Sequence, residues 1–164
     1  MNSKTVLLIY GEGGHRAEME KLFSKLSSNI SARVNYFGLF ENGDKILGID
    51  SNIELPVIRD KYSRLKTLLN AVWAPVAIVY KVFKLDRRHP VSTIISVGPG
   101  ISILPCLYFK ILRRNVIIVS IENSCKFKRS YTGTVMNYVA DYHYVQNRSL
   151  LEFYSNAVYS GKLL

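Results

Sequence analysis

The sequence contains few cysteines and few acidic residues. Its 164 residues include two cysteines, Cys106 and Cys125, which lie far apart and lack the spacing of metal ligands. Two such cysteines provide no disulfide framework, so the composition favours a reducing cytosol. Lysine and arginine number 22 against 12 aspartates and glutamates, which gives a net charge of +10. This imbalance favours anionic partners, namely phosphates, acidic lipid headgroups, nucleic acid or an acidic protein.

An obvious secretory or membrane-spanning segment is also missing. The residues before the first apolar run are too few and too polar for a signal peptide. The nearest candidate for a transmembrane helix, residues 67–80, contains Pro75 and is shorter than the roughly 18 residues that a span requires. With 48% hydrophobic and 21% charged residues, the chain has a globular composition. We therefore expect a single domain over residues 1–164 and no spanning helix.

Short apolar runs alternate with segments of helical spacing along the chain. Strands are expected at residues 6–10, 33–40, 53–58, 93–97, 116–121, 142–146 and 157–159. Helices are expected at residues 15–26, 64–85, 101–112 and 131–139. This alternation predicts an α/β fold, a Rossmann-like parallel sheet with helices on both faces. Ligands of such sheets bind at the carboxyl ends of the strands, so the loops that follow the strands are the candidate sites.

The first expected strand ends in a glycine-rich turn. Gly11, Gly13 and Gly14 would let backbone N–H groups approach a ligand, and the helix that follows would favour an anion such as pyrophosphate. His15 stands at the start of that helix, where a general base could act. The dinucleotide fingerprint is incomplete, because the third glycine and a clear acidic residue after the second strand are missing. The incomplete fingerprint argues against a nucleotide-binding oxidoreductase. For the glycine segment itself, the alternative to a ligand site is a tight turn with a capping histidine.

A second glycine loop follows the expected strand at residues 93–97. Gly98 and Gly100 lie in this loop, and a helix is again expected after it. The two loops should meet at the same edge of the sheet, where together they fit a diphosphate better than one loop does. Turn chemistry alone is the alternative.

The segment after the strand at residues 116–121 carries further polar candidates. Glu122 could hydrogen-bond a sugar hydroxyl or orient His15, and Asn123 follows it directly. Arg129 belongs to a basic cluster that could neutralise phosphates, and Thr132 opens the next expected helix. The alternative is a solvated basic loop.

A long apolar segment with basic ends occupies the middle of the chain. Residues 64–88 are apolar nearly all round at their centre, whereas helices that cover a core usually keep one polar face. Aromatic residues and flanking cations suit an anionic membrane interface. The expected membrane contacts are Leu68, Leu69, Trp73, Val76, Tyr80 and Phe83, with the cations Lys66, Lys81 and Lys84. A core or partner-interface helix is the alternative, and nucleic acid is disfavoured because no helix-turn-helix, zinc or ribonucleoprotein motif occurs.

Taken together, these segments resemble one protein family. The matching pieces occur in the family's order and span essentially the whole chain, at residues 11–15, 18–19, 98–100, 105, 121–122, 131–133, 140–141, 145–146 and 159–163. The family is the Alg-fourteen/PssD group of oligosaccharide-synthesis proteins, which includes bacterial subunits of capsule and exopolysaccharide glycosyltransferases. Each piece is weak alone, but the ordered set is fairly specific.

The resemblance implies the N-terminal, acceptor-side half of a GT-B glycosyltransferase that works with a separate small subunit for the nucleotide-sugar. The glycine-histidine loop is also distantly similar to that of the peptidoglycan enzyme that adds N-acetylglucosamine to a lipid-linked sugar. By that similarity His15 is the candidate base or acceptor contact, and Gly13 and Gly14 would hold the lipid diphosphate. Eukaryotic members carry an N-terminal membrane anchor, which is not expected here. The helix at residues 64–88 would instead attach the protein peripherally to the cytoplasmic face of the membrane.

The expected activity is inverting transfer of a sugar from a nucleotide-sugar to a hydroxyl of an undecaprenyl-diphosphate-linked sugar in polysaccharide biosynthesis. His15 and Glu122 are the candidate catalytic residues. The nucleotide-sugar is a substrate, no cofactor is expected, and no metal is expected because no cluster of metal ligands is visible in the sequence. The alternative is a non-catalytic membrane scaffold that recruits and activates a partner glycosyltransferase.

Overall fold

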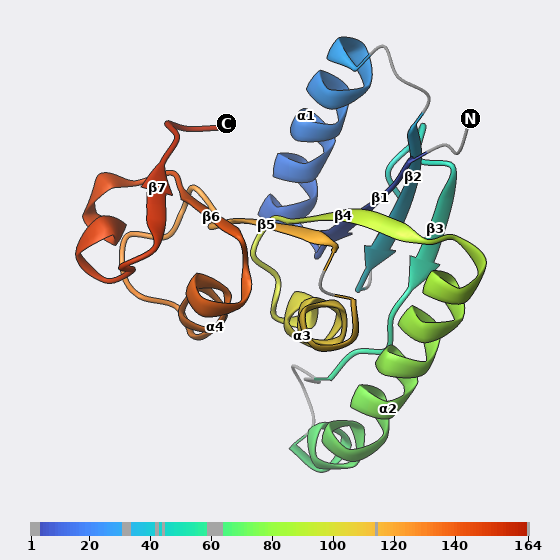
Figure 1. The fold of residues 1–164 in the computed structure, drawn as a ribbon. Helices are drawn as coiled ribbons and strands as arrows, with labels where there is room; N and C mark the ends of the chain where they lie inside the picture. Colours follow the sequence, from blue (N-terminus) through green and yellow to red (C-terminus); the bar gives the residue numbers. More distant parts are fainter. Residues whose placement is uncertain are drawn as a thin grey trace.

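The chain forms one parallel β-sheet with helices packed against it (Figure 1). The computed structural model describes residues 4–30, 34–41, 43, 45–58, 64–113 and 115–163. The strands are β1 (Lys4–Tyr10), β2 (Val34–Phe40), β3 (Ser51–Glu54), β4 (Val91–Ser96), β5 (Ile117–Ile121), β6 (Tyr142–Val145) and β7 (Ala157–Tyr159). The helices are α1 (Gly14–Asn29), α2 (Arg64–Arg88), α3 (Ile103–Leu112) and α4 (Tyr131–Val139), with the 3₁₀ turns η1 (Gly100–Ser102) and η2 (Arg148–Glu152).

The strand order places β1 inside the sheet. The order is β3-β2-β1-β4-β5-β6-β7, and every neighbouring pair is parallel. The chain moves outward from β1 through β2 and β3, and α2 then carries it back to β4 on the other side of β1. The loops after β1 and β4 therefore flank the point where the strand order reverses, which is where open α/β sheets bind ligands.

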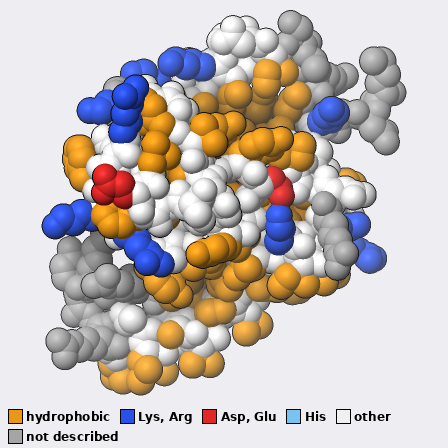
Figure 2. Space-filling view, turned by 60° about the vertical axis from the view of Figure 1, so that its left-hand side comes forward, with side chains coloured by type: hydrophobic (Ala, Val, Ile, Leu, Met, Phe, Trp, Pro, Cys, Tyr) orange, Lys and Arg blue, Asp and Glu red, His pale blue; other side chains and the backbone are white. Residues whose placement is uncertain are grey.

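The helices cover the two faces of the sheet unequally (Figure 1). Successive strand residues point to opposite faces. Leu7 and Ile9 belong to the core that includes residues of α2, α3 and α4, whereas Leu8 and Tyr10 pack with residues of α1. Among the described elements, α1 is the only long helix on its face, and the core beneath it contains residues of β1 and β2, with Ile95 of β4 and Ile121 of β5 packed against them. Figure 2 turns the side that carries the last strands toward the viewer and shows patches of hydrophobic side chains with few acidic ones.

The expected fold class is confirmed, and each expected strand and helix is present, α4 and β7 with the expected bounds and the others with shifted ends. β3 ends at Glu54, earlier than expected, because Pro56 has no N–H with which to extend the ladder. The expected helix at residues 101–112 is divided into η1 and α3. Pro105 lies in the first turn of α3, where a missing N–H is tolerated. Residues 33, 42 and 44 of the expected second strand and loop lie outside the described residues.

The helix α2 is longer than its charge-free run suggested. It continues through Pro75 to Arg88, and residues 67–88 are long and apolar enough to cross a membrane by length and composition. The uncharged run still ends at Tyr80, as expected, and the apolar helix reaches this length because it continues past Lys81 and Lys84. A buried stripe packs the second half of α2 on the sheet, through Ala74, Ile78, Val82 and Leu85.

Candidate functional site

The two glycine loops meet at the carboxyl edge of the sheet, as the sequence predicted. A Cβ built on Gly11 would lie 3.2 Å from the Cβ of Pro99, so the loops after β1 and β4 are in direct contact. Gly13 and Gly98 have φ angles of +58° and +83°, in the left-handed region that favours glycine. These positions require glycine for the turns themselves, and the turn at Gly13 leads directly into the start of α1 at this edge of the sheet.

The start of α1 has features that favour the binding of an anion. Gly13 is its N-cap, no side chain caps it, and its first turn contains no acidic residue. A Cβ on Gly13 would meet no atom within 4 Å, so the space beside it is open. Unsatisfied N–H groups and the positive end of the helix dipole favour a phosphate at such a position. The arrangement suits the diphosphate role predicted for Gly13 and Gly14, which stays a prediction.

The imidazole of His15 is held in one tautomer. Its Nδ1 lies 2.6 Å from the carbonyl oxygen of Val97. A carbonyl only accepts hydrogen bonds, so Nδ1 carries the proton and donates it to Val97. The amide nitrogen of Asn123 lies farther away, 3.5 Å from the same Nδ1. The lone pair therefore resides on Nε2, which is the arrangement that a general base needs.

Glu122 is buried away from the imidazole. Its side chain is 3% exposed, and its Oε1 accepts a hydrogen bond of 2.7 Å from the hydroxyl of Ser130, the N-cap of α4. Burial raises the pKa of this carboxyl, against the lowering effects of the Ser130 hydrogen bond and of Lys126. Among the contacts of the described residues, Asn123 and not Glu122 lies beside His15. Its predicted role in orienting His15 is not what the structure shows, and its catalytic role stays a prediction.

Sequence reasoning missed a buried polar network beneath the loops. Glu18 is fully buried in α1, and its Oε1 accepts the Ser124 backbone N–H at 2.7 Å and the Gln146 amide at 3.2 Å. The same Gln146 amide donates to the carbonyl of Glu122, and its Oε1 accepts the N–H of Leu163. The network ties α1 to the ends of β5 and β6. The sequence signals were the position of Glu18 one helical turn after His15 and the family-matching pieces at residues 18–19, 121–122, 145–146 and 159–163.

Of the remaining predicted site residues, Gly14 and Thr132 lie near other candidates and Arg129 does not. The hydroxyl of Thr132 is 3.8 Å from a Cβ built on Gly100, in the second glycine loop. Gly14 approaches Asn123 closely, with 3.4 Å from its built Cβ to the amide nitrogen. Arg129 is exposed, and its Nε donates to the hydroxyl of Thr134 rather than toward the glycine loops. No group of three histidine, cysteine, aspartate or glutamate side chains that could hold a metal ion occurs within the described ranges.

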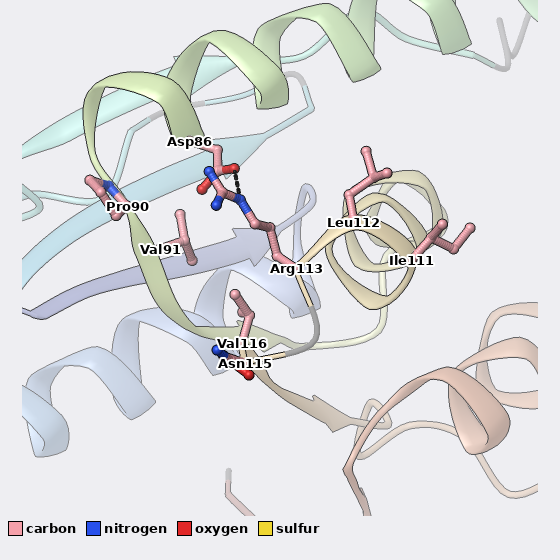
Figure 3. Close-up of a pocket in the computed structure, with 8 residues that line it drawn as sticks. All are labelled: Asp86, Pro90, Val91, Ile111, Leu112, Arg113, Asn115 and Val116. Carbon is pink, nitrogen blue, oxygen red and sulfur yellow. Dashed lines mark hydrogen bonds and ion pairs between the residues drawn. The ribbon is translucent and has the colours of Figure 1, made fainter.

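A separate pocket of about 450 Å³ lies at the opposite edge of the sheet (Figure 3). It opens where β4 and β5 begin and where α2 and α3 end. Asp86, which is 3% exposed, forms an ion pair of 2.8 Å with Arg113 at its wall. The hydroxyl of Tyr108 also reaches Asp86, at 3.4 Å. The ion pair connects α2 to the residue that follows α3, and it forms the charged part of the pocket wall. The glycine loops lie at the other edge of the sheet.

His143 gives the protein a predicted sensitivity to acid. It is 2% exposed on β6, neither ring nitrogen has a hydrogen-bond partner among the described residues, and burial lowers its pKa to about 4. An unfolded histidine titrates near 6.5, so the unfolded state takes up the proton first as the pH falls. Stability is therefore complete above pH 6.5 and decreases between pH 6.5 and 4, by about 2 kcal/mol between pH 7 and 5. We expect His143→Leu to flatten this acid limb in urea unfolding, and the exposed His89→Gln variant to keep it.

Proteins similar in sequence to the chain are glycosyltransferase subunits. The UDP-N-acetylglucosamine transferase subunit ALG14 of Mus musculus is 26% identical over 185 residues, which cover 99% of this chain and 84% of that protein. The ALG14 subunit of Kluyveromyces lactis is 24% identical, over 100% of this chain and 80% of that protein. The chain is similar to ALG14 subunits along its whole length. No protein-family model matches it.

Solved structures with the same fold include glycosyltransferases of the GT-B class. MurG of Acinetobacter baumannii has a TM-score of 0.64 and 12% identity, over 98% of this chain and 44% of that chain. A UDP-N-acetylglucosamine 2-epimerase has a TM-score of 0.66 and 10% identity, over 98% of this chain and 48% of that chain. The chain thus spans less than half of each structure. At these identities the likeness shows the fold alone, a Rossmann-like parallel sheet with helices.

Proposed function

We propose that the chain is the acceptor-side half of a glycosyltransferase that works at a membrane with a separate donor-binding subunit. The observation that carries this proposal is the imidazole of His15, held by Val97 with Nε2 free, beside the uncapped start of α1. The similarity of the chain to ALG14 subunits supports its proposed role as a subunit of a transferase. The proposed acceptor is a sugar on undecaprenyl diphosphate, in the synthesis of a capsule or exopolysaccharide.

In the proposed reaction the residues of this chain hold the acceptor and remove its proton. The N–H groups at the start of α1 bind the acceptor diphosphate, with the glycine loops around it. Nε2 of His15 accepts the proton of the acceptor hydroxyl while the hydroxyl oxygen bonds to the anomeric carbon of the donor sugar. The bond from that carbon to the nucleoside diphosphate breaks on the opposite side, which inverts the configuration. Donors on the partner subunit stabilise the charge of the leaving diphosphate.

A separate donor subunit is supported by the similarity of the chain to proteins that are named as subunits of a UDP-N-acetylglucosamine transferase. Equilibrium binding of UDP-N-acetylglucosamine to this chain, to a small donor-binding candidate encoded beside it, and to their mixture tests this division. We expect binding only where the small subunit is present. Binding of equal strength by the isolated chain would contradict the proposal.

The exposed surface of α2 supports attachment to a membrane. All the predicted apolar contacts are exposed, by 46% to 70%: Leu68, Leu69, Trp73, Val76, Tyr80 and Phe83. Their neighbour Val72 is 74% exposed. None of the described side chains at positions 65 and 67–73 is buried, so this part of α2 makes little contact with the domain. Lys84 is exposed, the Lys81 ammonium donates to the carbonyl of Glu54, and the side chain of Lys66 lies outside the described residues. An apolar helix half without a covering core is suited to a lipid interface.

A single acidic substitution on α2 should release the protein from vesicles. Val72 is 74% exposed, and Val72→Glu places a carboxylate on the apolar surface without touching the core. We expect at least about a 10-fold weaker partition into vesicles of phosphatidylcholine and phosphatidylglycerol in flotation assays, from lost apolar burial and repulsion by anionic lipid. Tyr138→Glu, at a 72% exposed position of α4, is the matched control and should bind normally. Equal binding by both variants and the parent would contradict a lipid contact through α2.

A non-catalytic scaffold is the second candidate function. The exposed apolar surface of α2 favours it, since a recruiting subunit needs only a membrane contact and a partner contact. The two candidates differ in what they require of His15, because a scaffold does not use a free imidazole nitrogen.

A further inference from the structure

The pocket at the amino edge of the sheet has an apolar wall and a charged wall (Figure 3). The apolar wall is formed by Val91 of β4, Val116 before β5, and Ile111 and Leu112 at the end of α3. Ile111 and Leu112 are 69% and 63% exposed, so they form an apolar rim that water reaches. The volume of about 450 Å³ is within the range of ligand sites in proteins.

The guanidinium of Arg113 is fixed in the charged wall and still has donors for a ligand. Its Nε donates to Oδ2 of Asp86 at 2.8 Å, and Asp86 is 3% exposed. Among the described residues, Asp86 is the only hydrogen-bond partner of this guanidinium, so its terminal N–H groups remain for a ligand. The exposed amide of Asn115 lines the same pocket. An oriented guanidinium with free donors favours a phosphate or a carboxylate.

The surroundings of the pocket are basic. Arg87 and Arg88 end α2, and both are exposed. The sequence contains no aspartate or glutamate at residues 87–116. Asp141, which reaches α3, is paired with Lys110 at 2.6 Å. Since the carboxylate of the charged wall is paired as well, the local charge favours an anion in the pocket.

The exposed apolar surface of α2 leads to this pocket. Val72 and Val79 precede Asp86 by 14 and 7 residues, and residues seven apart lie on nearly the same side of a helix. Val72 is 74% exposed and Val79 is 39% exposed. The apolar side of α2 that is proposed to contact lipid therefore ends at the charged wall, where Asp86 holds Arg113.

We propose that the pocket binds one anionic phospholipid, with its phosphate on Arg113 and Asn115 and an acyl chain against Ile111 and Leu112. This inference rests on the proposed membrane contact and adds a specific headgroup site to it. Inorganic phosphate would leave the apolar rim in water, whereas an uncharged lipid would leave the guanidinium without an anion. A phospholipid occupies both walls, and an anionic membrane leaflet supplies it.

The test is an NMR titration of the full chain with dihexanoyl phosphatidylglycerol, a short lipid that dissolves as a monomer. We expect saturable shifts of the Ile111 and Val116 amides. Asn115→Asp should have at least about a 5-fold higher Kd, because the new carboxylate repels the phosphate. Leu112→Glu, at the exposed rim, is a second variant that should weaken binding in the same direction. Ser24→Asp makes the same change in net charge on α1, which packs on the reverse face of the sheet, and should keep the parental Kd.

Four results would overturn the inference. Equal Kd values for the parent and both pocket variants place the lipid elsewhere. Saturable shifts at Gly13 and Gly98 instead assign its phosphate to the glycine loops. Inorganic phosphate that binds as tightly as the lipid assigns the pocket to a free anion. A Kd of Asn115→Asp that rises for the donor-binding subunit and not for the lipid assigns the pocket to a protein.

The inference and the proposed membrane contact can fail separately. If Val72→Glu releases the protein from vesicles but the parent shows no saturable binding of the short lipid, the headgroup site is wrong and the contact through α2 stands. If the parent binds the short lipid at the pocket but does not bind vesicles, the membrane contact is wrong and the headgroup site stands.

Discussion

Replacing His15 by asparagine is expected to reduce kcat for sugar transfer roughly 10²- to 10⁴-fold, the usual contribution of a general base. An asparagine amide can still donate to the carbonyl of Val97, in place of the Nδ1 hydrogen bond of 2.6 Å. It has no counterpart of Nε2, so the variant keeps the local structure and loses only the proton acceptor. The measurement is single-turnover transfer to a lipid-linked acceptor by the complex of both subunits.

The control for this variant is a histidine away from the two glycine loops. His89 is exposed at the end of α2 and packs its ring against Phe37, so His89→Gln should leave transfer unchanged. Partner affinity of the His15→Asn chain should equal that of the parent. If its transfer rate also equals that of the parent, His15 is not the base, and the scaffold becomes the better account of this chain.

Replacing Gly133 by alanine is expected to destabilise the protein by about 2 kcal/mol or more. A Cβ at this position would overlap the hydroxyl of Tyr154 and lie 2.5 Å from Oε2 of Glu122. Overpacking of this kind costs about 3 kcal/mol, against about 1 kcal/mol gained from the higher helix propensity of alanine. Tyr154 is 2% exposed and accepts the N–H of Ser130, so its ring has little freedom to move.

The matched control is an alanine at a roomier glycine. The nearest neighbour of a Cβ on Gly100 would be the hydroxyl of Thr132, at 3.8 Å, which is ordinary van der Waals contact. Urea unfolding should therefore give a midpoint for Gly100→Ala close to that of the parent. Equal stability of the two alanine variants would contradict the packing described around Glu122 and Tyr154.

The order of strands and helices could be predicted from the sequence, because local patterns of apolar residues and glycines determine it. Continuous apolar runs identify strands that are buried on both faces, and glycine turns mark their carboxyl ends. Gly11 and Gly98 therefore lie at one edge of the sheet, as the sequence predicts. The helix α2 was expected at residues 64–85 and ends only three residues later, at Arg88.

The detail of the site depends on long-range contacts that no local pattern contains. Glu18 meets Gln146 across 128 residues, and the choice between Glu122 and Asn123 beside His15 depends on how the β5 loop turns. The exposure of Ile117, Tyr142 and Val158 on β5, β6 and β7 was likewise not predicted. It depends on which face of the sheet each helix covers, and α3 and α4 pack on the face opposite α1.

The most direct test of the proposed function is a reconstituted transfer assay with separately purified subunits. Radiolabelled UDP-N-acetylglucosamine is supplied to this chain, to the small donor-binding subunit, and to their mixture, with an undecaprenyl-diphosphate-linked sugar in vesicles. We predict label in the lipid fraction only from the mixture, and none when His15→Asn replaces the parent chain. Full transfer by either subunit alone, or by the mixture that contains His15→Asn, would contradict the account of this chain as a catalytic acceptor-side half.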